Sequence, residues 1–196
     1  MEKKRAVFLD RDGTINKDVG YPNSFSQIQI YPYSFEAVRL IDHMGLMSIV
    51  ITNQSGIGRG LIQENQLEDI HKKMCSCFES HQARLNRIYY CPHYIFSSDP
   101  IYRVDCSCRK PRPGLAYQAC LDLNLDLKNS YVVGDKVSDI LLGLNIGAKT
   151  ILVLTGYGRA SSEQLKRMGL SPDSIEHTLL DAVRWIQKKG NSPRRE

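Results

Sequence analysis

The sequence predicts an α/β fold in which helices cover a mainly parallel sheet. Short continuous apolar runs, such as 6–9 and 47–51, are typical of strands buried on both faces, as in parallel sheets. Segments with helical spacing alternate with these runs, which favours parallel pairing of the strands. The length of 196 residues suits one domain with a full core, so we expect a single domain over 1–190 and a disordered tail over 191–196.

The expected elements follow in chain order. Ser34 can cap the first helix, and the pattern Ser161-x-x-Gln164 resembles the capping box of a short helix. Buried strands are expected over 6–9, 47–51, 87–90, 131–133 and 150–154. Helices are expected over 34–43, 63–79, 137–145 and 179–186, with another that opens at 113–114.

Composition and charge narrow the class of protein. The 26 basic and 21 acidic residues give a net charge of +5, which is compatible with an anionic small molecule but too diffuse to favour nucleic acid. No apolar run approaches membrane-spanning length and no signal peptide precedes the first strand, so we expect a cytoplasmic protein without a membrane partner. In that compartment the six cysteines are expected as thiols or metal ligands rather than disulfides.

Two carboxylates, Asp10 and Asp12, follow the first predicted strand, and Gly13 then permits a sharp turn. Open α/β sheets place their functional sites at the carboxyl ends of their strands. The alternative is an ordinary strand end with a polar turn. A buried strand seldom ends in two carboxylates that nothing neutralises, however, so the pair indicates a metal or a catalytic task.

Polar residues also follow two other predicted strands. Thr52 and Asn53 end the second strand, Asp135 follows the fourth, and Lys110 lies in a loop before a helix. In a parallel sheet these ends converge on one edge. Carboxylates, one lysine and one hydroxyl suit Mg²⁺ and a phosphate, and a carboxylate can itself attack phosphorus.

A second cluster consists of Cys91-x-His93 and Cys106-x-Cys108. Four ligands of this kind suit a closed tetrahedral Zn²⁺ site, which would staple a loop that has too few apolar residues to hold itself. Unrelated thiols beside a surface histidine are the alternative, and a disulfide is less attractive in a reducing compartment. Three further cysteines lie on predicted helices and are interpreted as packing residues: Cys75, Cys77 and Cys120.

Four motifs of the chain resemble those of the haloacid dehalogenase superfamily, in the same order. They are Asp10-x-Asp12-Gly13-Thr14, Thr52-Asn53, Lys110 and Gly134-Asp135-x-x-x-Asp139. The resemblance implies a Rossmann-like three-layer core. Only about forty residues separate the first two motifs, which leaves no room there for a large cap domain.

The resemblance also implies a role for each matching residue. Asp10 would be the nucleophile that forms an aspartyl-phosphate, and Asp12 would act as general acid and then as base. Thr52 and Lys110 would bind the phosphoryl oxygens. Mg²⁺ would be held by the carboxylates of Asp10 and Asp135 and by the backbone carbonyl of Asp12, with Asp139 supporting the metal shell or Lys110.

The loop that carries the four predicted zinc ligands (91–108) and the segment CSCRKPRPG resemble one branch of the superfamily. This branch comprises heptose bisphosphate and histidinol-phosphate phosphatases. The resemblance implies removal of the 7-phosphate from D-glycero-D-manno-heptose 1,7-bisphosphate, in ADP-heptose and lipopolysaccharide core biosynthesis. Arg109 would hold the second phosphate through its guanidinium fork. The implied substrate contacts are Asp18, Val19, Gly20, Tyr21, Asn53, Gln54, Ser55, Arg109 and Lys136.

Several other functions stay open at this point. They are a histidinol-phosphate or other small sugar-phosphate phosphatase, a phosphatase of nucleic-acid ends, and a zinc-stapled binding module without catalysis. The modest charge speaks against nucleic acid. The expected partner is a small sugar bisphosphate, and the expected state is a monomer.

Overall fold

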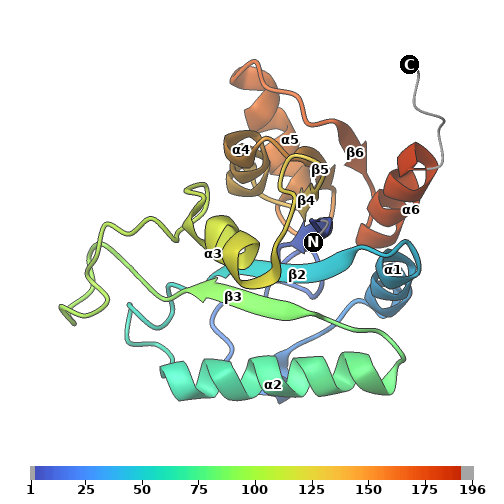
Figure 1. Ribbon diagram of the computed structural model, residues 1–196. Helices are drawn as coiled ribbons and strands as arrows, with labels where there is room; N and C mark the ends of the chain where they lie inside the picture. Colours follow the sequence, from blue (N-terminus) through green and yellow to red (C-terminus); the bar gives the residue numbers. More distant parts are fainter. Residues whose placement is uncertain (1–2, 191–196) are drawn as a thin grey trace.

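A computed structural model describes residues 3–190 and contains a six-stranded parallel sheet (Figure 1). The strand order is β3-β2-β1-β4-β5-β6, and every neighbouring pair is parallel. The strands are β1 (Ala6–Leu9), β2 (Met47–Asn53), β3 (Arg87–Cys91), β4 (Tyr131–Gly134), β5 (Lys149–Val153) and β6 (Ser174–Glu176). The predicted α/β fold with a mainly parallel sheet is confirmed, with β6 as the one strand that was not predicted.

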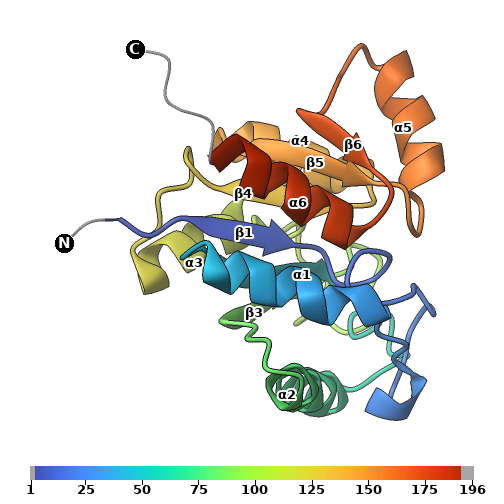
Figure 2. The same cartoon turned by 90° about the vertical axis from the view of Figure 1, so that its right-hand side faces the viewer.

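Helices cover both faces of this sheet. They are α1 (Pro32–His43), α2 (Glu64–Ser80), α3 (Gly114–Leu123), α4 (Val137–Ile146), α5 (Gly158–Arg167) and α6 (Leu179–Gly190), with a 3-10 turn η1 (Phe25–Gln27). In Figure 2, α1 and α6 lie side by side in front of β1. The sheet and the helices on its two faces make up three layers.

The alternation of side chains along β1 explains the two cores. Val7 and Leu9 point to the face that packs against α1, α2 and α6. Ala6 and Phe8 point to the opposite face, toward α3 and α4. All four side chains are buried, because a strand with helices on both faces has no solvent side.

Two predicted helix caps are wrong. The first helix begins at Pro32, and no side chain caps it; the hydroxyl of Ser34 is buried inside α1 and donates to the Ile15 carbonyl at 2.8 Å. That bond ties the loop after β1 to the helix. Ser161 likewise lies within α5, which begins at Gly158, rather than at its N-terminus.

The strand order reverses between β1 and β4, which is where open α/β sheets form a crevice at the carboxyl ends of their strands. Between β1 and β2, only η1 and α1 interrupt the loop, so no cap domain is inserted there. No helix within 3–190 is long and apolar enough to cross a membrane. The predicted tail at 191–196 lies outside the described residues, and the single-domain organisation stays a prediction.

Candidate active site

Lys110 lies at the centre of a buried cluster beneath this crevice. Its ammonium Nζ is 2.8 Å from Asp10 Oδ1 and 2.7 Å from Asp139 Oδ1, and it donates to the Ile51 carbonyl at 2.7 Å. The cluster joins the end of β1, the end of β2, the loop before α3 and the first turn of α4. Chain segments far apart in the sequence therefore meet at one ammonium group.

The charge of this lysine is fixed by its surroundings. Burial alone would lower the pKa of Lys110, but the carboxylates of Asp10 and Asp139 outweigh it and raise the pKa above its usual value. The backbone of Lys110 is held as well, because Asn53 accepts from its N–H at 3.0 Å and donates to its carbonyl at 3.2 Å. Asn53, predicted as a substrate contact, thus positions the lysine.

Three carboxylates lie together beside Lys110: oxygens of Asp10, Asp135 and Asp139 are all within 4.8 Å of one another and buried. Burial, and after it the Asp10 carboxylate, raise the pKa of Asp135 to about 8. The backbone closes over Asp135, since a Cβ added at Gly13 or at Gly156 would come within 2.2 Å of its Oδ2. This concentration of negative charge and hard oxygen donors fits a divalent cation such as Mg²⁺.

The raised pKa of Asp135 predicts pH-dependent Mg²⁺ binding. Below pH 8 a proton competes for this carboxylate, so the apparent affinity for Mg²⁺ falls by about tenfold per pH unit as the pH drops. Calorimetric titration with Mg²⁺ at several pH values checks this. Asp69→Asn, which changes an exposed carboxylate on α2, serves as the control and keeps the same slope. An affinity that stays constant from about pH 8 to pH 6 would contradict the prediction.

Asp12 is held differently from Asp10. Its carboxylate accepts four hydrogen bonds, from Arg11 Nε (3.0 Å) and Asn16 (2.9 Å) at Oδ1, and from Arg11 Nη2 (2.8 Å) and Gln54 (2.8 Å) at Oδ2. Burial opposes ionisation, but the Arg11 charge and these bonds outweigh it and lower the pKa of Asp12. In this arrangement Asp12 is an ionised carboxylate, ready to accept a proton.

The remaining predicted groups line an open cavity of about 520 Å³ next to these carboxylates. Gln54 reaches into the polar network, where it also donates to Thr52 at 2.8 Å. Of the nine predicted substrate contacts, only Val19 is not among the lining residues. The lining comprises Asp12, Asp18, Gly20, Tyr21, Asn53, Gln54, Ser55, Arg109, Lys110, Lys136, Ser138 and Tyr157.

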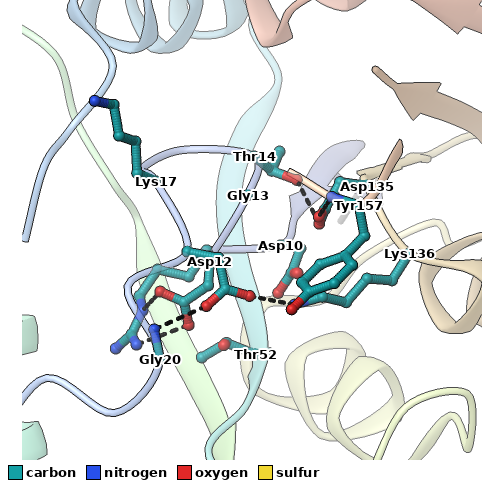
Figure 3. A network of polar contacts seen from close by, with 12 residues as sticks. Asp10, Asp12, Gly13, Thr14, Lys17, Gly20, Thr52, Asp135, Lys136 and Tyr157 are labelled. Carbon is teal, nitrogen blue, oxygen red and sulfur yellow. Dashed lines mark hydrogen bonds and ion pairs between the residues drawn. The ribbon is translucent and has the colours of Figure 1, made fainter. Parts of the chain in front are cut away.

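Lys136 provides a second cationic group at this cavity. It forms an ion pair with Asp18 at 3.1 Å, and Figure 3 shows it extending toward Asp10. Burial lowers its pKa, but the carboxylates of Asp10, Asp135 and Asp18 outweigh burial and raise it. Lys136 therefore stays protonated and available to an anionic ligand.

Tyr157 and Arg11 belong to the site, although sequence reasoning missed both. The backbone N–H of Tyr157 donates to Asp135 Oδ2 at 2.8 Å, and its ring lies 5.2 Å from Lys136 Nζ (Figure 3). The position of Tyr157 after β5, at the same sheet edge, was a signal that could have revealed it. Arg11 had no such signal, because an arginine between two aspartates resembles a surface charge.

The second predicted cluster is also assembled. Cys91 Sγ lies 3.5 Å from Cys106 Sγ and 3.7 Å from His93 Nδ1, which in turn lies 3.2 Å from Cys108 Sγ. A tetrahedral Zn²⁺ with Zn–S bonds of ~2.3 Å separates two thiolates by about 3.8 Å, close to these spacings. Burial and the neighbouring sulfurs raise the pKa of Cys108, so a bound cation is needed for all three thiols to ionise together.

This Cys/His cluster is linked to the cavity, which gives a second prediction. Arg109 Nη1 donates to the His93 carbonyl at 3.4 Å. We expect Cys106→Ser to lower the melting temperature by about 5–10 °C, the shift for a loss of ~2–3 kcal/mol, and to raise KM for phosphorylated substrates. Zinc content, thermal melting and steady-state kinetics check this. Cys77→Ser on α2, a cysteine outside the cluster, is the matched control. A zinc-free variant with unchanged melting and KM would show that the cluster is dispensable.

Comparison with known proteins identifies the family. A family model for HAD-hydrolase-like proteins matches residues 107–182. The D-glycero-beta-D-manno-heptose-1,7-bisphosphate 7-phosphatase of Pasteurella multocida is 44% identical over 154 residues, which are 78% of this chain and 83% of that protein. The protein of the same name from Haemophilus ducreyi is 38% identical over 185 residues, 93% and 98% of the two chains. The chain belongs to this family of HAD-like phosphatases.

A solved member of the heptose bisphosphate phosphatases shares the fold. The D,D-heptose 1,7-bisphosphate phosphatase of B. bronchiseptica, crystallised with magnesium and phosphate, superposes with a TM-score of 0.81 at 28% identity. The match covers 94% of this chain and 99% of that one. The resemblance inferred from the four motifs and the Cys/His loop is thereby confirmed, as is the three-layer architecture.

Proposed function

We propose that this heptose bisphosphate phosphatase family member removes the 7-phosphate of D-glycero-D-manno-heptose 1,7-bisphosphate. The observation that carries the proposal is the distribution of positive charge in one cavity. All three cations line this cavity, but Lys110 is buried against Asp10, whereas Arg109 and Lys136 are only partly buried. Two phosphates at different depths match this arrangement, and a guanidinium fork suits the outer one.

Asp10 is the nucleophile in this proposal. Its carboxylate attacks the phosphorus of the 7-phosphate, and the bond from phosphorus to the sugar oxygen breaks, which leaves an aspartyl-phosphate on Asp10. Lys110, fixed 2.8 Å from Asp10, neutralises charge on the phosphoryl oxygens, to which the Thr52 hydroxyl donates. Asp10, Asp135 and the Asp12 carbonyl would hold Mg²⁺, which supplies further positive charge when bound.

Asp12 transfers a proton in both half-reactions. It gives a proton to the departing sugar oxygen, and then takes one from the water that attacks the phospho-aspartate. The four donors around its carboxylate favour the ionised form. To hold the proton for the first step, one Asp12 oxygen has to give up at least one of these hydrogen bonds.

A comparison of substrates tests the proposed function. Phosphate release is measured with Mg²⁺ on the heptose 1,7-bisphosphate, the corresponding 1-phosphate and 7-phosphate, and histidinol phosphate. We expect the bisphosphate to have the highest kcat/KM of the four substrates. Its product is expected to keep the phosphate at position 1. Faster turnover of histidinol phosphate would overturn the choice of substrate while keeping the chemistry. The expectations of a monomer and of a cytoplasmic location stay predictions.

Arg109 offers a sharper prediction on the second phosphate. Arg109→Lys keeps a charge but loses the two-pronged geometry, so kcat/KM for the bisphosphate is expected to fall by about 10–100-fold. The same variant is expected to change kcat/KM for the 7-phosphate by less than about threefold, because that substrate has no second phosphate. Equal losses on both substrates would show that Arg109 does not contact the second phosphate.

A further inference from the structure

A buried arginine stands behind the proton-transfer group of this site. Arg11 is completely buried, and two nitrogens of its guanidinium hold the two oxygens of Asp12. Its third nitrogen, Nη1, lies 3.1 Å from Nε2 of His71 on α2. A single guanidinium therefore bridges the loop after β1 and helix α2.

The chemistry of this contact fixes the state of His71. A guanidinium has only donors, so Nε2 must accept, and the ring must be neutral with its proton on Nδ1. Burial, and after it the Arg11 charge, lower the pKa of His71 to about 3. The imidazole is thus neutral at pH values well above 3, and its Nε2 accepts from Arg11. It acts neither as a general acid nor as a pH switch.

His71 is itself held rigidly. It is 7% exposed, and its ring packs against Tyr90 of β3 with centroids 5.6 Å apart. Tyr90 in turn donates to Glu64 at 2.9 Å, in the first turn of α2. The acceptor for Arg11 is therefore a fixed part of the scaffold.

We propose that His71 is a positioning residue for catalysis: it fixes Arg11, whose fork aligns the Asp12 carboxylate for proton transfer to the leaving sugar oxygen. Without this acceptor, Arg11 Nη1 would be a buried donor that has to find another partner. A guanidinium is planar and rigid, so rotation toward a new acceptor would move both bonds to Asp12. This inference rests on the proposed role of Asp12 as general acid.

The test compares two substrates that differ in their need for an acid. A sugar phosphate releases a poor leaving group that requires protonation, whereas 2,4-dinitrophenyl phosphate releases one that does not. kcat/KM reports the steps up to departure of that group. The ratio of the two kcat/KM values does not depend on the fraction of active enzyme, so partial unfolding of a variant leaves it unchanged.

The variants are His71→Leu, which removes the acceptor, and His71→Gln, which retains an acceptor oxygen on a side chain of similar reach. His43→Leu, at an exposed histidine of α1, is the matched control. We expect His71→Leu to lower the ratio of sugar phosphate to dinitrophenyl phosphate by about tenfold or more, part of the ~10²–10⁴ that a general acid contributes. We expect His71→Gln to restore most of that loss.

Two outcomes would overturn the inference: a ratio for His71→Leu within about twofold of the wild type, or a His71→Gln ratio no better than that of His71→Leu. Failure of the proposed substrate is a separate result, because it appears in the wild type. If the wild type does not hydrolyse the heptose bisphosphate, the same ratio is measured with whichever alkyl phosphate it does hydrolyse.

Discussion

Asp10→Asn is expected to lower phosphate release by about 10⁴-fold or more. The amide has nearly the same shape as the carboxylate, but it cannot attack phosphorus and carries no charge for Mg²⁺. Its oxygen can still accept a hydrogen bond from Lys110, which lies 2.8 Å from Asp10 Oδ1 in the wild type. The variant is therefore expected to fold. Steady-state kinetics on the heptose bisphosphate, together with thermal melting, give the comparison.

Asp69→Asn is the matched control for this change, because it removes a carboxylate from the exposed surface of α2. We expect its kinetics to equal those of the wild type. A folded Asp10→Asn variant that kept more than about a tenth of wild-type turnover would show that another group attacks phosphorus.

The second large effect is expected for Lys110→Met. Methionine fills a similar volume, but it leaves Asp10 and Asp139 buried without their cation. The loss of charge stabilisation at the phosphoryl oxygens lowers kcat by about 10²–10³-fold. Removing one partner of a buried ion pair costs about 3–5 kcal/mol, so the metal-free variant also loses stability.

Added Mg²⁺ should recover part of that stability but not the turnover, because the cation neutralises the carboxylates without replacing the ammonium. Urea unfolding with and without Mg²⁺, and kcat at saturating substrate, separate the two effects. Lys73→Met, at an exposed lysine of α2, is the control. A Lys110→Met variant with wild-type kcat would contradict the role of Lys110 in charge compensation.

Much of the fold was predictable because the buried strands coincide with continuous apolar runs in the sequence. The run Ala6–Leu9 has helices on both faces, so none of its positions had to be polar. The polar residues that follow β1 and β4 were equally visible, and parallel pairing brings their strand ends to one edge. The meeting of Asp10 and Asp135 follows from this topology, whereas Lys110 reaches them from the loop before α3.

The rest depended on contacts that sequence spacing does not encode. Strand β6 has only three residues, none of them buried, so it lacks an apolar run. Arg11 and His71 are separated by 60 positions, and each alone resembles an ordinary polar residue. Their pairing exists only because α2 packs beside the loop after β1.

A covalent phosphoryl group on Asp10 is the intermediate on which the proposed mechanism depends, and it can be trapped within one turnover. The enzyme is mixed with Mg²⁺ and the heptose bisphosphate, quenched in acid within the first turnover, digested, and analysed by mass spectrometry. We expect one added phosphoryl group on the peptide that carries Asp10, removable by hydroxylamine and lacking in Asp10→Asn. A phosphoryl group on a different residue would contradict it, as would a burst of released sugar with no phosphorylated peptide.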